Sequence, residues 1–233
     1  MSRKFLGALI FILAFSVVFQ PTIAATNTPT WSVEEGDTIV WEVKSAPNST
    51  FIWWDMNTGA VAVNVTTGSK ITLNITKVGP DDVYGDFSIG NLTAKNVSMT
   101  TIGFNIIIGV WPFVLGPVVP TNTWDNITAK AEDANVQTIK EDNMKSYLGF
   151  PRETIEFANT TESKGSFDIV YDKNSGVLLY CYGEFGAYAI TFEIVETTVN
   201  LKISNIVINV GIGVAGIVIA IVAIILFLRI KKK

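Results

Sequence analysis

The sequence predicts a mainly β domain with a helical insertion (α+β), built on a curved antiparallel sheet or half-barrel with one or two helices. One C-terminal transmembrane helix is expected to follow it. Several runs alternate apolar and polar residues with period two, which is typical of strands with one buried face. Short turns join these runs, which favours antiparallel pairing. One segment between the two sets of strands has helical spacing, and a long uncharged apolar run lies near the end.

The clearest strand signal is the stretch "AVAVNVTTGSKITLNITKV". Val63 and Leu73 each belong to an apolar row, and Asn64 and Asn74 alternate with them. A short turn containing glycine separates the two rows, which predicts a hairpin with one apolar face. We therefore expect Asn64 and Asn74 to face solvent on adjacent strands, with Val63 and Leu73 pointing inward.

Weaker patterns predict the other strands of the N-terminal half. "GDTIVWEV" places Ile39, Trp41 and Val43 on one face. "TFIWWDM" is expected to be a short buried or edge strand. "TTIGFNIII" is expected to be a strand that leads into an apolar segment.

Residues 165–196 predict three consecutive strands joined by the turns "DKNSG" and "GEFG". In the first turn, the side chain of Asp172 or Asn174 is expected to bind nearby amides, and Gly176 to adopt a positive φ. A calcium site using Asp172, Asn174 and the acidic run at 81–86 is an alternative, but the full ligand set of such a site is missing.

The helical insertion is predicted at "WDNITAKAEDANV". Ile127, Ala131 and Ala134 share one face, and Asn122 or Thr123 is placed to cap the first turn. The following stretch, "TIKEDNMKSYLGF", is compatible with a second helix that ends at its glycine or with two short strands.

The segment Trp111–Pro120, "WPFVLGPVVP", is apolar but contains three prolines. Proline removes backbone donors, and an irregular segment facing lipid would leave polar groups unsatisfied, so a membrane-spanning structure is excluded. We expect this segment either to fill the core or to form the rim of a cavity for an apolar ligand.

The N-terminus is predicted to be a cleaved secretory signal. Residues 1–25 begin with Arg3 and Lys4, continue with an apolar run and end in small residues. A retained N-terminal anchor is the alternative. We expect the mature chain to begin at Ala25 or Thr26.

The C-terminus is predicted to be a membrane anchor. Ile206–Leu228 holds 23 residues and no charge. At about 1.5 Å per residue, it is long enough to cross a bilayer core of about 30 Å. The basic tail at 229–233 predicts a cytoplasmic end. The extracellular β-rich domain is therefore expected over 26–199, with a juxtamembrane linker at 200–205.

Small residues in the predicted span would let two copies of the helix pack closely. Gly211 with Ala215, and Gly216 with Ala220, form pairs of small residues four positions apart. Self-association through this face is therefore an expectation, beside the membrane as the main partner.

Composition excludes several classes of function. Six of the 17 basic residues lie in the terminal segments, which leaves 11 basic against 21 acidic residues in the exported part. This charge repels phosphates, so no nucleic-acid partner is expected. The chain has no histidine and one cysteine, which excludes imidazole metal sites and Ser–His–Asp or Cys–His mechanisms. We predict no catalytic, cofactor or metal residue, and expect Cys181 to be a small buried residue.

Seven N-x-S/T sequons predict a glycosylated outer surface. Their acceptor residues are Asn48, Asn64, Asn74, Asn91, Asn96, Asn126 and Asn159. Many sequons without disulfides suit an archaeal envelope.

Two motifs, "WPFVLGPVVPTNTWDNITAKAEDAN" and "VYDKNSGVLLYCYGEFGAYAITFEIV", resemble anchored surface proteins of Asgard archaea. These proteins combine a signal peptide with a C-terminal anchor of the choice-of-anchor type. The resemblance covers about two thirds of the chain and implies an exported, anchored architecture, without an activity to carry over.

The order of strands and helix is also similar to the half-barrels of lipoprotein carriers, in which a curved sheet holds acyl chains under a helix. This resemblance implies an aromatic and apolar ligand-lining set on the concave side. With the apolar segment included, the set is Trp53, Trp54, Trp111, Phe113, Leu115, Tyr180 and Tyr182.

Three functions are compatible with these patterns. The leading interpretation is a non-enzymatic, membrane-anchored envelope protein that holds a lipid or other apolar ligand. The second is a structural or adhesive surface module without a ligand pocket. The third is a hydrolase that uses two carboxylates on envelope sugars and needs no histidine. A continuous apolar cavity would favour the first, a filled core the second, and two carboxylates facing each other in a cleft the third.

Overall fold

The computed structural model describes residues 28–46, 50–55, 59–106, 115–159, 166–185 and 188–201. The predicted signal peptide, the predicted span Ile206–Leu228 with its small-residue pairs, and the basic tail lie outside these ranges. Within the ranges, no helix is long and apolar enough to cross a membrane.

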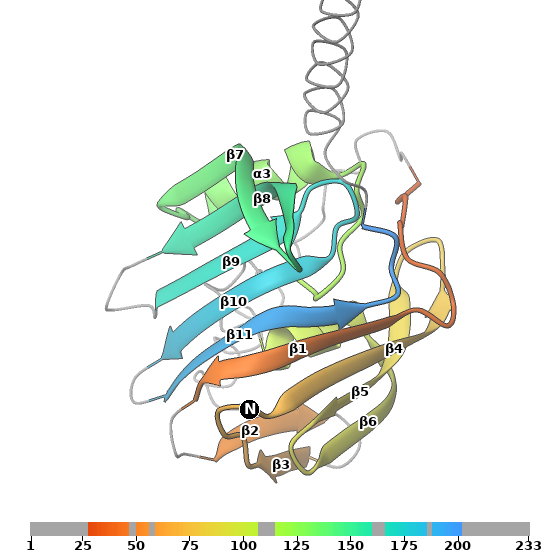
Figure 1. The fold of residues 1–233 in the computed structure, drawn as a ribbon, viewed down its shortest axis with the longest axis vertical. Helices are drawn as coiled ribbons and strands as arrows, with labels where there is room; N and C mark the ends of the chain where they lie inside the picture. Colours follow the sequence, from red (N-terminus) through yellow and green to blue (C-terminus); the bar gives the residue numbers. More distant parts are fainter. Residues whose placement is uncertain are drawn as a thin grey trace, which may run out of the picture.

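The fold is built on a nine-stranded antiparallel sheet (Figure 1). The order is β6-β5-β4-β1-β11-β10-β9-β8-β7. Because β1 pairs with β11, an N-terminal half (β1 and β4–β6) is joined to a C-terminal half (β7–β11). The prediction of a mainly β, antiparallel fold is confirmed. The strands are β1 (Thr38–Ser45), β4 (Lys70–Val78), β5 (Val83–Ile89), β6 (Leu92–Ser98), β7 (Thr138–Tyr147), β8 (Phe150–Asn159), β9 (Ser166–Asp172), β10 (Leu178–Phe185) and β11 (Tyr188–Thr197).

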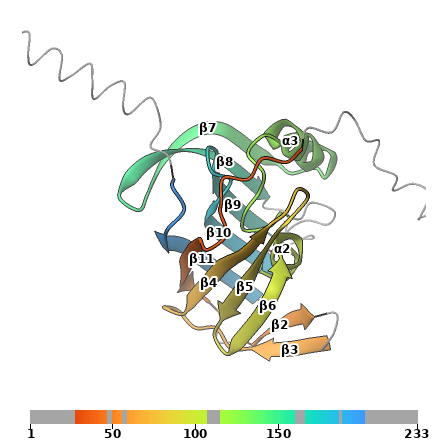
Figure 2. The same cartoon turned by 90° about the vertical axis from the view of Figure 1, so that its right-hand side faces the viewer.

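A second layer covers one face of this sheet. Helices α2 (Met99–Ile106) and α3 (Trp124–Asp133) lie on the same side, together with the two-stranded sheet of β2 (Phe51–Asp55) and β3 (Gly59–Val63) (Figure 2). The segment 115–121, here called the strap, runs between the two helices. We call the side under these elements the covered face, and the opposite side the open face.

Apolar side chains fill the covered face. Trp41 is fully buried, and its indole N–H donates to the carbonyl of Leu178 at 2.8 Å. Trp53 of β2 is 1% exposed and stacks on Phe87 of β5, with 5.1 Å between ring centroids. Cys181 is buried among them, as expected. The buried residues form one cluster that includes both halves of the sheet, and the fully buried side chains contribute about 1.5–3 kcal/mol each.

For the predicted hairpin around "TTGS", the side chains that face solvent and core are predicted correctly, but the pairing of the strands is wrong. Asn64 and Asn74 are exposed, and Val63 and Leu73 are buried. However, β3 pairs with β2, whereas β4 pairs with β1 and β5. The loop between β3 and β4 instead hydrogen-bonds to Val43 of β1. Alternation shows which side chains face the core, but it does not show which strand is the neighbour.

The strand expected at "TTIGFNIII" is wrong, because residues 100–106 belong to helix α2. The Ser98 hydroxyl oxygen accepts a hydrogen bond from the Thr101 N–H at 3.1 Å and caps the first turn. Gly103 lets the helix touch the strap, since a Cβ there would lie 2.1 Å from the carbonyl oxygen of Leu115. Threonine and isoleucine favour strands, but packing against the strap decides the structure here.

Helix α3 lies where helical spacing predicts it. Ile127, Ala131 and Ala134 are buried. Thr123 precedes the helix, but its side chain does not cap it; the hydroxyl donates to the carbonyl of Pro120 instead.

The stretch "TIKEDNMKSYLGF" forms strand β7 and the following turn, so the interpretation as a second helix is wrong. Leu148 and Gly149 both have positive φ, of 53° and 77°, which is the geometry of a two-residue hairpin turn. Asp142, at φ 55°, marks an irregularity where the pairing of β7 with β8 shifts.

The three predicted C-terminal strands are confirmed as β9, β10 and β11. In the turn after β9, Asp172 Oδ1 accepts from the backbone N–H of Ser175 at 2.8 Å and from its hydroxyl at 2.9 Å. Gly176 has φ +71°, as expected.

The structure describes Leu115–Pro120 of the proline-containing apolar segment, and this part packs into the core. Val118 forms an antiparallel bridge with Val177, and the Tyr171 hydroxyl donates to the carbonyl of Gly116 at 2.9 Å. The core-filling interpretation therefore holds for this part of the segment.

A buried arginine fixes the end of the domain. Nη1 of Arg152 on β8 donates to the carbonyl of Leu201 at 3.2 Å, and Nε donates to the carbonyl of Tyr147 at 3.4 Å. Nη1 also lies 3.8 Å from Asp172 Oδ2. Burial raises the pKa of Asp172, although the hydrogen bonds from Ser175 oppose this rise.

Candidate functional site

The structure does not bring the predicted ligand-lining residues together. Trp53 is part of the packed core, and Leu115 lies half-buried between α2 and α3. Tyr180 and Tyr182 flank the buried Cys181 on β10, so they lie on the open face. These tyrosines therefore lie on the face opposite to Cys181, because neighbouring residues of a strand face opposite sides. That they line a ligand stays a prediction. Trp111, Phe113 and the side chain of Trp54 lie outside the described residues.

The sequons are unevenly exposed. Asn159 is 3% exposed at the end of β8, so its amide is not presented at the surface. Asn48 lies outside the described residues. The acceptors with exposed side chains are Asn64, Asn74, Asn91, Asn96 and Asn126.

These exposed acceptors are confined to particular parts of the surface. Asn74 points to the open face from β4, because it alternates with the buried Leu73. Asn96 lies on the edge strand β6, Asn91 in the turn before it, and Asn64 after β3. Asn126 lies on α3. Among the described residues, the open face of β8–β11 carries no exposed sequon.

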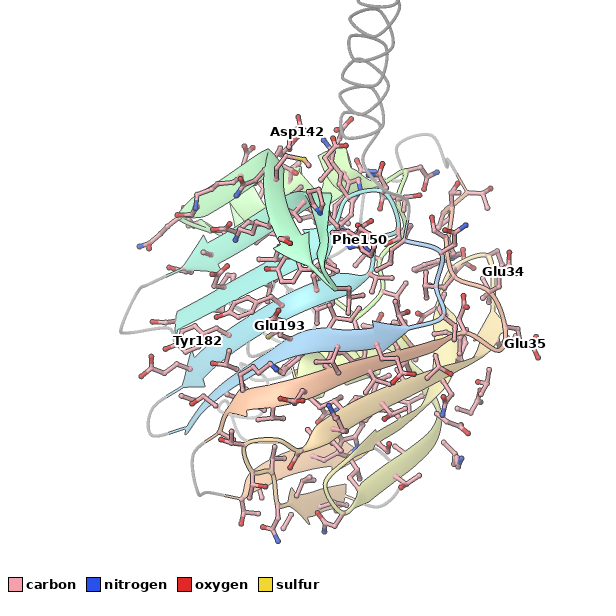
Figure 3. All side chains as sticks on the ribbon, in the orientation of Figure 1. Glu34, Glu35, Asp142, Phe150, Tyr182 and Glu193 are labelled. Atoms are coloured by element: carbon pink, nitrogen blue, oxygen red, sulfur yellow. The ribbon has the colours of Figure 1, made fainter. Side chains whose placement is uncertain are left out.

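The open face of β8–β11 carries a cluster of tyrosines and carboxylates instead. We call Tyr147, Glu156, Asp168, Tyr180 and Glu193 the open-face cluster. Tyr180 stands directly opposite Glu193 on the neighbouring strand β11. Tyr180 and Glu156 both pair with Val170, from opposite sides of β9. Tyr182, next along β10, stands opposite Asp168. Figure 3 shows Tyr182 and Glu193 on the side of the sheet away from the helices.

The two carboxylates on β8 and β9 have different environments. Burial alone would raise the pKa of Glu156, but Lys140 and Lys145 bind its two oxygens at 2.7 and 2.6 Å and lower the pKa. Asp168 has a buried Oδ1 atom without a hydrogen-bond partner. Burial and the neighbouring Glu156 raise the pKa of Asp168.

The β7–β8 hairpin adds aromatic side chains to this face. Tyr147 is nearly buried; burial first, and then the carboxylates of Glu193 and Asp168, raise the pKa of its hydroxyl. Phe150 begins β8 next to the turn and is 51% exposed. Figure 3 shows Phe150 at the β7–β8 turn, on the same side of the sheet as Glu193. Exposed aromatic side chains beside polar groups are typical of the central residues of binding interfaces.

The carboxylates considered for sugar hydrolysis and for calcium are already bound within the protein. Both Glu156 oxygens are held by lysines and the residue is 5% exposed, so it is not placed to attack a sugar. Asp172, the proposed calcium ligand, is used in its own turn. Within the described part of the chain, no three His, Cys, Asp or Glu residues are grouped to hold a metal ion.

The edges of the sheet are poor sites for adding a strand. β6 is interrupted at Asn96, which has φ 50°, and β7 at Asp142. β7 also carries four charged residues, "KED" and Lys145. Irregular and charged edges prevent pairing with another chain. A partner would therefore meet a face of this sheet, not an edge.

No protein-family model matches the chain, and no curated protein shows significant similarity to it. Sequence reasoning missed Tyr147, Asp168 and Glu193. Alternation shows which residues face away from the core, but it does not show which of them lie together in the folded protein. The pairing of β8 to β11 brings them together. The absence of sequons after Asn159 is the one signal in the sequence that points to β9–β11.

Proposed function

We propose that this protein is an exported, membrane-anchored and glycosylated cell-surface protein. In this proposal, its β domain binds a partner protein through the open face of β8–β11. The signal-like N-terminus, the apolar span and the sequons support the location. The observation that carries the binding face is the separation of surfaces: exposed sequons lie elsewhere, whereas the exposed Phe150 and half-buried tyrosine and carboxylate side chains lie here.

The filled covered face supports this function over that of a carrier. A half-barrel that carries acyl chains needs a continuous apolar cavity, whereas here the corresponding surface holds Trp41, Trp53 and Phe87 of the protein itself. The charge of the open face indicates the partner. Asp168 and Glu193 have no ion pair within the described residues, so lysine or arginine side chains of a partner would complement them.

Site-specific photo-crosslinking in intact cells tests this proposal. Benzoylphenylalanine replaces Phe150 or Tyr182 in the full chain, and replaces Ile52 or Val78 as matched exposed controls. We expect one discrete protein adduct from Phe150 and Tyr182 and none from the controls. The crosslinked segment of the partner should be basic.

Two results would overturn the proposal. One is equal crosslinking from all four positions, which would indicate random collisions. The other is the absence of protein adducts together with one equivalent of lipid copurifying with the chain, which would favour the carrier.

A further inference from the structure

A cavity of about 290 Å³ lies between α2, the strap and α3. Met99, Leu115 and Ile127 belong to the apolar part of its lining. The exposed residues Asn126 and Lys130 also line it, so the cavity opens to solvent beside α3. Its volume is at the lower end of the range for small-molecule sites, which suits a ligand of one or two rings.

The acceptor of the sequon Asn126-Ile127-Thr128 faces this cavity. The lining residues on α3 and directly before it are Thr123, Asn126, Ile127 and Lys130. They recur at spacings of three or four residues, so they share one side of the helix. Helical side chains also lean toward the N-terminus of their helix. The Asn126 side chain therefore lies on the cavity side of α3, over the turn that begins at Thr123.

Asn126 differs from most other exposed acceptors in its surroundings. The side chains of Asn64, Asn74 and Asn91 each hydrogen-bond to a neighbouring residue of the protein. Among the described residues, no hydrogen bond engages the side chain of Asn126. Of the described sequon acceptors, only Asn126 lines this cavity. A glycan can therefore be attached to Asn126 without breaking a hydrogen bond, and its first sugar would begin at the cavity.

The exposed part of the lining offers polar groups that suit sugar hydroxyls. Asp81, in the turn between β4 and β5, and Lys130 are exposed and have no ion pair within the described residues. Thr100 on α2 adds a hydroxyl group. A carboxylate accepts hydrogen bonds, an ammonium group donates them, and a hydroxyl does both. A neutral ligand with several hydroxyls can bind to all three groups, whereas an ion of either sign would meet a like charge.

Backbone contacts fix the wall formed by α2 and the strap. A Cβ on Gly103 would lie 2.1 Å from the carbonyl oxygen of Leu115, and a Cβ on Gly116 would lie 2.7 Å from the carbonyl oxygen of Met99. Helix and strap therefore touch where only glycine fits. A wall fixed in this way is preorganised, which reduces the entropic cost of binding.

Covalent attachment makes weak contacts sufficient to hold a sugar here. A short flexible link gives the attached group an effective concentration in the millimolar range. An effective concentration about 10 times the dissociation constant of the free sugar would keep the cavity mostly occupied. Since only the folded state has the cavity, an occupied cavity would slow every opening of its walls by about the same 10-fold factor.

We propose that this cavity holds the first sugar of a glycan attached to Asn126; this site rests on the glycosylated surface proposed above. The apolar face of the pyranose ring would lie against the apolar part of the lining, and its hydroxyls would bind Asp81, Thr100 and Lys130. The sugar would join α2, the strap and α3, so this glycan would be part of the folded domain.

Hydrogen exchange on the full chain in nanodiscs tests this site. The chain is made in cultured animal cells with high-mannose glycans, and endoglycosidase H trims each glycan to one N-acetylglucosamine. Glycopeptide mass spectrometry then gives the occupancy of Asn126. Asn126→Gln removes the sugar, and glutamine favours a helix more than asparagine does, so the substitution alone does not weaken α3. We expect about 10-fold faster amide exchange at Val119 and Thr121, which are hydrogen-bonded in the strap.

Thr93→Ala is the matched control, because it removes the sequon of Asn91, at the other end of β5 from the cavity. It should leave exchange in the strap unchanged. Thr100→Trp keeps the sugar on Asn126 but places a large side chain in the lining. In this variant, adding Asn126→Gln should change exchange in the strap little, because the sugar no longer occupies the cavity.

The outcomes separate this site from the proposed function. Equal exchange with and without the sugar at an occupied Asn126 would overturn the site alone. Equal effects of Asn126→Gln and Thr93→Ala would also overturn it, since they would indicate a general effect of glycans. An unoccupied Asn126 beside other occupied sequons would overturn it as well. Only the absence of glycans at every sequon would overturn the glycosylated surface together with the site.

Discussion

Asp168 has a carboxylate with one buried oxygen that lacks a hydrogen-bond partner, beside the carboxylate of Glu156. Because its pKa is raised in the folded state, the folded protein binds this proton more tightly than the unfolded chain does. The protonated side chain is therefore tolerated at low pH, and stability falls as pH rises through the folded pKa. We expect Asp168→Asn to stabilise the domain by about 1 kcal/mol at pH 7, and to have little effect below pH 4. Urea unfolding at the two pH values measures the difference.

Glu156→Gln is the matched control, because the shift of this pKa has the opposite sign. The pKa of Glu156 is lower in the folded protein than in the unfolded chain. The ionised side chain therefore stabilises the fold at pH values above the unfolded pKa, and this contribution is lost as pH falls. The substitution should destabilise the domain at pH 7, since Lys140 and Lys145 lose their partner. Effects of the same sign for both variants would contradict the assigned environments.

The surroundings of Arg152 predict a large effect of its substitution on stability. Its side chain is buried, and Arg152→Met would leave the carboxylate of Asp172 without a nearby cation. We expect a loss of about 3–5 kcal/mol in the free energy of unfolding. The double variant Arg152→Met with Asp172→Asn should recover part of this loss, because the amide oxygen can still accept from Ser175. A double variant no more stable than Arg152→Met would show that the lost hydrogen bonds to Tyr147 and Leu201 dominate.

The contact between the strap and the β9–β10 turn is the element most sensitive to a single methyl group. A Cβ on Gly176 would lie 1.9 Å from the carbonyl oxygen of Val119, and the residue has positive φ. Gly68 also has positive φ, at +85°, but has open space around it. Gly68→Ala should cost about 1 kcal/mol from backbone conformation alone. We expect Gly176→Ala to cost at least about 2 kcal/mol more, measured by chemical unfolding. Equal losses of stability in the two variants would mean that the strap moves away from the added methyl group at little cost in free energy.

Elements with strong local signals could be predicted, and those decided by distant contacts could not. The alternation of apolar and polar residues in β9–β11 and the apolar face of α3 can be seen from neighbouring residues in the sequence. These elements therefore lie where expected. Helix α2 depends on Gly103 meeting Leu115, and the pairing of β4 depends on β1 occupying the place beside it. For the same reason, the sequence identified Tyr180 but not the residues that surround it on the open face. The grouping of Tyr147, Asp168 and Glu193 depends on strand register, which alternation does not reveal.

The distribution of sequons over the whole molecule predicts a pattern of glycan occupancy. Mass spectrometry of glycopeptides from the folded, exported protein should find glycans at Asn64, Asn74, Asn91, Asn96 and Asn126, whose side chains are exposed. Asn159 should be unoccupied, because attachment there would require a buried side chain to leave the core. A fully occupied Asn159 would place modification before folding and would remove occupancy as a measure of surface exposure.

The place of β11 in the sheet determines how the domain responds to pulling. β11 lies between β1 and β10 and is hydrogen-bonded to both. Shortly after β11, Arg152 binds the carbonyl of Leu201. Tension that enters at the C-terminal end and acts along this strand shears two ladders of hydrogen bonds at once, whereas an edge strand such as β6 would peel away one bond at a time. In the proposed anchored protein, a partner held on the open face would pass its force to the C-terminal end through β8–β11, and the ladder between β1 and β11 would share this load with the N-terminal half.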